Sequence, residues 1–292
     1  MKESILILLV FMLCNTVLAQ NESHSEKCLT NNQFEDRYAS YSPDGNWIIF
    51  ESNRNGKWGI YLMDTDGKDV QRLTIDTYDC RRPFWHPDGK KILFESERNG
   101  SWNLYTIKIK NKKEKQLTQI VENGKLVFAS YSPNGKRIAA SLQETEEKSN
   151  IVVLSRNGKL KKWLTNNEKR NFYPRWSKDG KEIIYFSRKD TDNQDDEIYR
   201  LNIKNGNDVR LTNWHKHNFC PSWSADGKKI VYVTSMEDTR PEIYIMDIDG
   251  SNQTRITYNQ DGDTLPNWHP KANKILLTAY RNGNYEICEL EL

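Results

Sequence analysis

The sequence has no marked excess of charge of either sign. Its 292 residues include 43 Lys and Arg against 40 Asp and Glu, a formal net charge of +3, with no long run of one sign. A basic stripe of the kind that binds nucleic acid is therefore excluded, and we expect no nucleic-acid partner. Aliphatic core residues are also scarce, since hydrophobic residues make up 36% of the chain. Nine Trp and fourteen Tyr compensate, because each large ring buries roughly 150–250 Å².

Long hydrophobic runs are missing as well. The run from Ile5 to Cys14 is too short to span a bilayer comfortably, so we expect no transmembrane segment. Lys2 precedes this run and Val17-Leu18-Ala19 follows it, which is the pattern of a signal peptide over residues 1–19. A lipoprotein signal at Cys14 is disfavoured because Leu13 is not small. The sequence thus predicts cleavage near Ala19 and a periplasmic or secreted protein.

Cysteines are few and lack metal-ligand spacing. After loss of the signal peptide, four remain: Cys28, Cys80, Cys220 and Cys288. The chain also lacks the Gly-x-Ser-x-Gly motif of serine hydrolases, and its acidic loop at 190–197 lacks the glycine and spacing of an EF-hand. We expect no cofactor and leave open a bound divalent cation.

A turn motif recurs six times along the chain. The copies begin at Ser42, His86, Ser132, Ser177, Ser224 and His269, at steps of 44, 46, 45, 47 and 45 residues. Most contain Asp-Gly or Asn-Gly between short β-branched or aromatic runs, which is typical of hairpins. Asp44, Asp88, Asp179 and Asp226 are therefore interpreted as turn residues rather than catalytic carboxylates or calcium ligands.

Each unit contains three such runs, and the first five end in a fourth, such as Arg72-Leu73-Thr74. The sixth unit has no fourth run before Leu292, but Cys28-Leu29-Thr30 near the start supplies a matching copy. The N-terminal segment is thus predicted to complete the last unit and close a ring, which removes open sheet edges. The fold class is all-β: a six-bladed β-propeller of four-stranded antiparallel blades.

Ring closure would place Cys28 and Cys288 on neighbouring strands of the last blade. They are a disulfide candidate, with two buried space-filling thiols as the alternative. Cys80 and Cys220 fall in blades two and five, so we expect them to be free.

The segment from Trp223 to Ile256 closely resembles the propeller repeat of TolB, and the resemblance extends from Lys27 to the C-terminus. It implies a short segment at 20–26, a propeller over 27–292, and no N-terminal α/β domain of the TolB type. TolB itself works in the periplasm with the Tol–Pal envelope system. The Gly-His and Trp-Asp dipeptides of ordinary WD repeats are missing.

Propellers generally bind ligands at one mouth of the central channel, on the loops that enter the inner strands. Those segments mix aromatic rings with Arg and Asp, the residues that dominate protein-binding sites; the alternative is that the rings pack between blades and the charges are solvated. The candidate binding residues are Arg37, Arg81, Arg82, Tyr173, Arg175, His217 and Asp263. The predicted function is a monomeric binding module for a protein segment or small ligand, such as a cell-envelope protein or a saccharide.

An enzymatic alternative depends on histidine. His215 and His217 project to one side of an extended segment and form a half-site for a metal. Some TolB-like propellers are polysaccharide lyases with metal-bound histidines, so the resemblance also admits a metal-assisted lyase. His86 and His269 occupy the hairpin turns, and we expect them on the opposite face.

Overall fold

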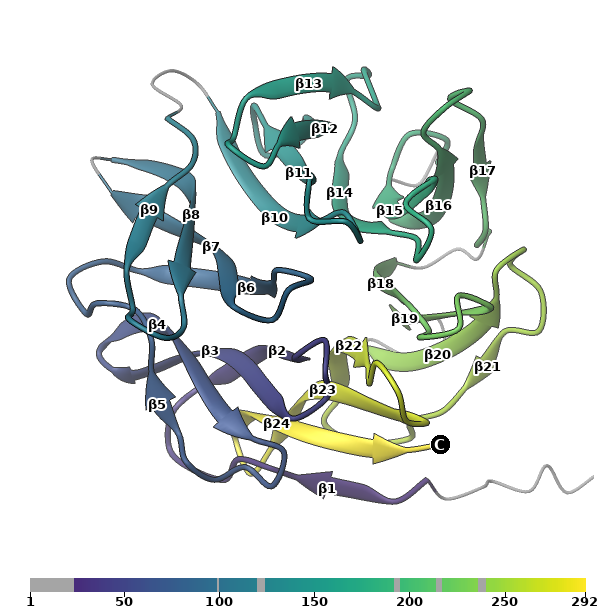
Figure 1. Ribbon diagram of the computed structural model, residues 1–292. Coiled ribbons are helices and arrows are strands. Elements are labelled where there is room, and N and C mark those ends of the chain that lie inside the picture. The colour runs from purple at the N-terminus through teal and green to yellow at the C-terminus, as the bar shows by residue number, and fades with distance from the viewer. Residues whose placement is uncertain (1–23, 99, 120–123, 192–194, 214–216, 236–239) are drawn as a thin grey trace, which may run out of the picture.

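Six four-stranded antiparallel sheets are arranged in a ring around a common axis (Figure 1). The computed structural model describes residues 24–98, 100–119, 124–191, 195–213, 217–235 and 240–292, so the predicted signal peptide lies outside the described residues. Within the described part there is no helix with the length and apolarity needed to span a membrane. The prediction of a six-bladed propeller is confirmed.

Each blade begins with its inner strand and proceeds outward. In chain order the strands are β1 (Glu26–Cys28), β2 (Asp36–Tyr41), β3 (Trp47–Asn55), β4 (Lys57–Asp64), β5 (Gln71–Arg72), β6 (Cys80–Trp85), β7 (Lys91–Arg98), β8 (Ser101–Lys108), β9 (Glu114–Gln116), β10 (Lys125–Tyr131), β11 (Arg137–Gln143), β12 (Ser149–Ser155), β13 (Leu160–Trp163), β14 (Asn171–Trp176), β15 (Glu182–Ser187), β16 (Glu197–Asn202), β17 (Asp208–Arg210), β18 (Asn218–Trp223), β19 (Lys229–Thr234), β20 (Glu242–Asp247), β21 (Thr254–Arg255), β22 (Asp263–Trp268), β23 (Lys274–Arg281) and β24 (Asn284–Glu291).

Aromatic pairs fill the space between blades. Phe50 on β3 lies opposite Tyr61 on β4, with ring centroids 5.7 Å apart, and Tyr185 pairs with Tyr199 in the same way at 5.6 Å. Blades two and five repeat this arrangement. Such cross-strand pairs explain how a chain with few aliphatic residues builds a core.

The recurring threonine ties the outermost strand to its neighbour. Thr165 Oγ1 accepts a hydrogen bond from the Ile151 amide at 2.8 Å and donates one to Asn150 at 3.0 Å. In the last blade Thr30 Oγ1 accepts from the Ile287 amide at 2.9 Å. The N-terminal segment therefore occupies the fourth position of the last sheet, as predicted.

The ring is closed by β1, which pairs with β24 in antiparallel register. Cys28 lies directly opposite Cys288 and is joined to it by a disulfide, which resolves the alternative that the sequence left open. Cys80 and Cys220 are free and buried, as expected.

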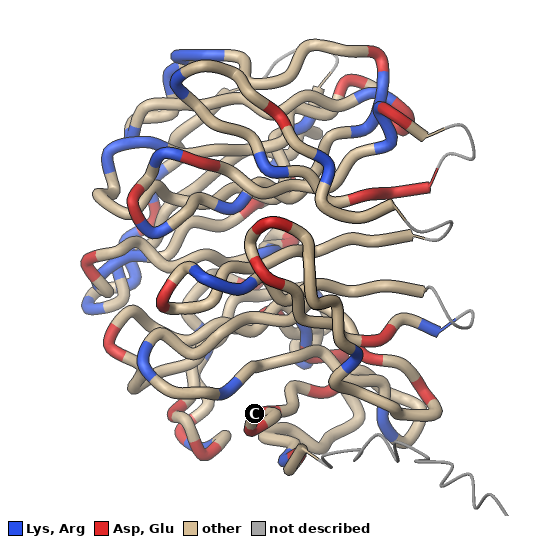
Figure 2. Tube along the Cα trace, turned by 90° about the vertical axis from the view of Figure 1, so that its right-hand side faces the viewer, with Lys and Arg blue, Asp and Glu red and all other residues tan. Residues whose placement is uncertain are grey.

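The two faces of the ring differ in their connections. The repeated turns lie on one face, here called the turn face, and the loops that enter the inner strands lie on the other, the entry face. At the turns, Asp44, Asp179 and Asp226 each accept a hydrogen bond from the preceding serine hydroxyl. These bonds hold the pKa of each carboxyl below its usual range and support the interpretation as turn residues. Basic and acidic residues are interspersed in the view of Figure 2 and do not form a stripe of one sign.

Candidate functional site

The six inner strands share a bulge near their midpoints. Register shifts at each inner pair, for example between Arg37 and Ser40 in β2 and between Arg81 and Phe84 in β6. At each bulge one non-glycine residue has a left-handed φ between 49° and 63°: Tyr38, Arg82, Phe128, Tyr173, Cys220 and Leu265. This left-handed conformation costs roughly 1–2 kcal/mol per residue, and it is repeated in every blade of the ring.

These six side chains meet at the channel, and we call them the axial layer. Arg82 lies 4.4 Å from the centroid of Phe128, and the Phe128 and Tyr173 centroids are 5.6 Å apart. Cys220 and Leu265 belong to one apolar cluster with Tyr173, against which Tyr38 packs. Burial raises the pKa of the Tyr38 phenol, opposed by the nearby Arg82 guanidinium, and raises that of the Cys220 thiol to about 12.

Charge is concentrated on the channel wall of blades one and two. Glu51 is fully buried and accepts hydrogen bonds from the Arg81 side chain at 2.8 Å and the Arg82 amide at 2.7 Å. Glu95 accepts from the Arg82 side chain at 2.6 Å and the Phe128 amide at 2.5 Å. Burial raises the pKa of the Glu95 carboxyl, and Arg82 acts against that rise.

The equivalent positions in the other blades carry no charge: Ser141, Phe186, Val233 and Thr278. At this position of the second strand, carboxylates are therefore confined to blades one and two. Glu51 pairs with Arg81 of the next blade, and Glu95 pairs with Arg82 of its own blade. Each carboxylate also accepts a hydrogen bond from a bulge amide of the next blade, so both stabilise the channel wall.

The entry mouth carries a stack of alternating rings and guanidinium groups. Arg37 lies 4.1 Å from the centroid of Tyr285 and 5.4 Å from that of Trp58, and Arg81 lies 4.3 Å from Trp58 on the neighbouring blade. We call Arg37, Trp58, Arg81 and Tyr285 the mouth cluster. Beside it is a hollow of about 630 Å³ whose lining includes Tyr285 and Glu35.

The sequence reasoning missed Trp58 and Tyr285. Both follow a hairpin glycine by two residues, in Gly56-Lys57-Trp58 and Gly283-Asn284-Tyr285. That Gly-x-aromatic pattern, which also occurs in Gly100-Ser101-Trp102 of blade two, is the signal that points to them, because it starts the third strand of a blade at the entry face.

The predicted binding residues do not form one site. Arg37 and Arg81 lie at the entry mouth, while Arg82 and Tyr173 belong to the axial layer. Arg175 lies beyond the bulge toward the turn face, where its guanidinium is 3.7 Å from the centroid of Tyr173 and donates to the carbonyls of Phe128 and Pro174. The inner strands thus place the predicted arginines at three depths of the channel.

Two further predicted residues lie away from the mouth cluster. Asp263 is fully buried, where it forms an ion pair with Arg281 at 2.7 Å and accepts a hydrogen bond from Asn259 at 2.6 Å. This carboxylate joins strands of the last blade and does not reach the surface. His217 is half exposed on blade five, with Nδ1 accepting a hydrogen bond from the Asp196 amide at 3.2 Å.

A histidine metal site gains no support from the described residues. His215 lies outside them, and His86 and His269 are at the turn face, opposite His217, as expected. In the described part of the chain, the one grouping of three potential metal ligands is Glu26, Cys28 and Cys288. Two of its members form the disulfide, so their sulfurs are already bonded.

Comparisons with known proteins agree on the fold. The model of the TolB beta propeller domain family matches residues 15–129, 119–238 and 192–292. The structure is similar to that of a putative TolB from Agrobacterium tumefaciens, with a TM-score of 0.63 and 27% identity, over 73% of this chain and 74% of that one. TolB from Acinetobacter baumannii gives a TM-score of 0.68 at 21% identity, over 88% of this chain and 63% of that one.

An enzyme with the same architecture is also similar. Oligogalacturonate lyase from Vibrio parahaemolyticus has a TM-score of 0.64 at 13% identity, over 93% of this chain and 94% of that one. At this identity the likeness concerns the fold alone. A curated relative, an uncharacterized protein of Agrobacterium fabrum, is 39% identical over 57 residues, so the match spans 20% of this chain and 20% of that protein.

Proposed function

Because the chain belongs to the TolB β-propeller domain family, we propose that it is an exported, monomeric binding module that holds a protein segment at its entry mouth. The observation that carries this proposal is the mouth cluster. Two arginines and two aromatic rings, contributed together by three blades, alternate there, and the arginine side chains remain 26% and 23% exposed.

The chemistry of the mouth cluster suits a protein partner. Trp, Tyr and Arg are the residues that contribute most to protein–protein affinity, since they combine large apolar area with polar groups. The rings restrict the guanidinium groups of Arg37 and Arg81, which lowers the entropy lost on binding.

Capture from a cell-envelope extract tests the proposal. The mature protein and an Arg37→Ala/Arg81→Ala variant are compared, and each captured protein is then purified for titration. Loss of two interface arginines should weaken binding by about 2 kcal/mol, or roughly thirtyfold in Kd. Arg72→Ala is the matched control, because Arg72 also lies over a ring, that of Tyr61 at 5.6 Å, but on the outer edge of blade one. Equal loss in both variants would refute the mouth as the binding surface.

Localisation and the enzymatic alternative have separate tests. N-terminal sequencing of the exported protein should give a sequence that begins near Gln20, and an intact Met1 would refute the signal peptide.

Metal analysis of the purified protein tests the alternative of a metal-assisted lyase. Stoichiometric manganese or zinc that is lost in His215→Ala/His217→Ala would replace the binding proposal with the enzymatic one.

A further inference from the structure

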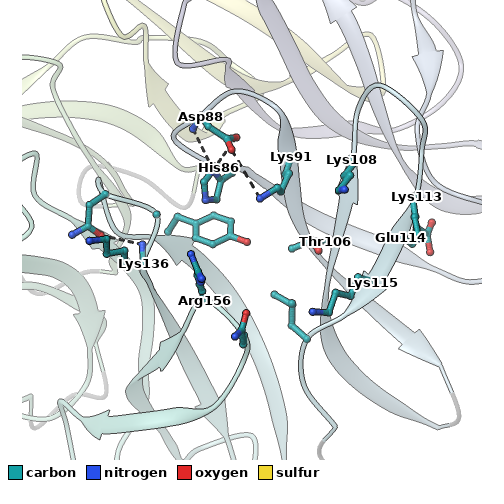
Figure 3. Close-up of a pocket in the computed structure, with 15 residues that line it drawn as sticks. His86, Asp88, Lys91, Thr106, Lys108, Lys113, Glu114, Lys115, Lys136 and Arg156 are labelled. Carbon is teal, nitrogen blue, oxygen red and sulfur yellow. Dashed lines mark hydrogen bonds and ion pairs between the residues drawn. The ribbon is translucent and has the colours of Figure 1, made fainter.

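Far from the entry mouth, a groove of about 730 Å³ lies on the turn face between blades two and three. We call it groove 2/3. Its lining includes six basic side chains, Lys91, Lys108, Lys113, Lys115, Lys136 and Arg156, and two acidic ones, Asp88 and Glu114. Figure 3 shows Lys91, Lys108 and Lys115 on the side of blade two, and Lys136 and Arg156 on the side of blade three.

The positive charge of groove 2/3 is largely uncompensated. Glu114 is already paired with Arg98 at 2.5 Å, and Asp88 contacts His86 at 2.8 Å and Lys91 at 4.0 Å. Among the described residues, the remaining five cations of the groove form no ion pair with a carboxylate. Like charges gathered without counter-charges repel one another, and an anion that enters the groove relieves that repulsion.

The equivalent groove between blades six and one shows whether blade packing by itself requires a basic lining. Both grooves have the same framework of a turn histidine packed edge-on against a tyrosine: His86 with Tyr131 at 4.6 Å, and His269 with Tyr41 at 4.4 Å. The second groove is lined by two lysines and three acidic residues, Asp66, Glu289 and Glu291. Packing of neighbouring blades therefore does not require a basic lining, and the groove between blades six and one does not share the charge of groove 2/3.

We propose that groove 2/3 binds a saccharide chain that carries anionic groups at intervals, as uronate or sulfate substituents do. The cations are distributed on both sides of the groove, so a single small anion would reach few of them. Between them lie hydrogen-bonding side chains suited to hydroxyl groups, namely Thr106, Asn134 and Asn157. Among the described residues, the lining of the groove includes no tryptophan and one arginine, which distinguishes it from the mouth cluster and from surfaces that bind protein segments.

Titration calorimetry of the full mature protein tests the proposal, with a uronate oligosaccharide and a sulfated oligosaccharide as separate probes at about 50 mM salt, where screening is moderate. At least one probe should bind saturably, and the relative affinities identify the anionic group. Lys108→Gln/Lys115→Gln/Lys136→Gln should weaken binding roughly tenfold, since exposed ion pairs contribute a few-fold each. All three lysines are exposed, so the variant should fold normally.

A matched control separates the groove from general electrostatic attraction. Lys57→Gln/Lys204→Gln/Lys228→Gln removes the same charge from exposed lysines elsewhere and should leave the affinity within about twofold. Equal weakening in both variants, or no saturable binding to the wild type, would overturn the proposal. Tighter binding of polyglutamate than of either saccharide would also overturn it, in favour of an acidic protein partner. Arg37→Ala/Arg81→Ala should bind the saccharide normally, so this test and that of the entry mouth fail independently.

Discussion

Removal of the Cys28–Cys288 disulfide should destabilise the protein without preventing ring closure. The two cysteines are separated by 260 residues, so the bond restricts nearly the whole unfolded chain. In the chain-entropy model, a disulfide that closes a loop of this length contributes about 5 kcal/mol to the free energy of unfolding. For a chain of this size, that corresponds to a fall in Tm of about 10 °C, at roughly 2 °C per kcal/mol.

Contacts that remain after reduction should keep the last blade intact in the native state. Thr30 donates a hydrogen bond to Glu286 at 2.6 Å, and Arg281 pairs with Glu26 of β1 at 2.9 Å. The free energy of unfolding should therefore fall while the native circular dichroism spectrum is retained. The free thiols Cys80 and Cys220 are buried, so native protein should show no rapidly reacting thiol before reduction.

Guanidinium unfolding of the oxidised wild type, the reduced wild type and Cys28→Ser/Cys288→Ser measures the effect. The reduced wild type and the variant should agree, and reductant should not change the variant. A decrease of less than about 1 kcal/mol would refute the account. It would mean that the unfolded chain is already restricted, or that β1 leaves its position without the bond.

Three further outcomes are expected. Thr165→Val should lower the free energy of unfolding by about 1–3 kcal/mol, because the buried Ile151 amide loses its side-chain acceptor and Asn150 Oδ1 loses one of its two donors. Urea unfolding checks this, with exposed Thr254→Val as the control, and an equal loss in the control would contradict the argument. Stability should fall as pH decreases below about 4, because Asp44, Asp179 and Asp226 have lowered pKa values in the folded state and the unfolded chain takes up protons first. Asp44→Asn/Asp179→Asn/Asp226→Asn should reduce that acid dependence in unfolding curves at different pH, and an unchanged dependence would assign it to other carboxyls. Trp102→Ala, which removes a half-buried ring of the entry face outside the mouth cluster, should leave capture of the protein partner unchanged, whereas Trp58→Ala should abolish most of it in the same assay.

The sequence alone was sufficient for the architecture, because each blade repeats the same local chemistry. The Asp-Gly turns, the short β-branched runs and the Leu-Thr ending recur with nearly constant spacing. The displaced copy at Cys28-Leu29-Thr30 predicted the closing strand. The sequence did not decide whether Cys28 and Cys288 form a disulfide or remain two thiols, because that depends on strand register. The pairing of β1 with β24 in the structure brings Cys28 opposite Cys288.

Tertiary structure decided where the functional side chains lie. The inner-strand bulges carry Tyr, Arg, Phe, Cys and Leu rather than the Gly or Asn that usually mark a left-handed residue, so no local signal predicted them. Each bulge changes which side chains face the channel, and neighbouring arginines such as Arg81 and Arg82 consequently lie at different depths. Groove 2/3 is likewise absent from any local pattern, because its cations come from two blades and share one space only when those blades pack side by side.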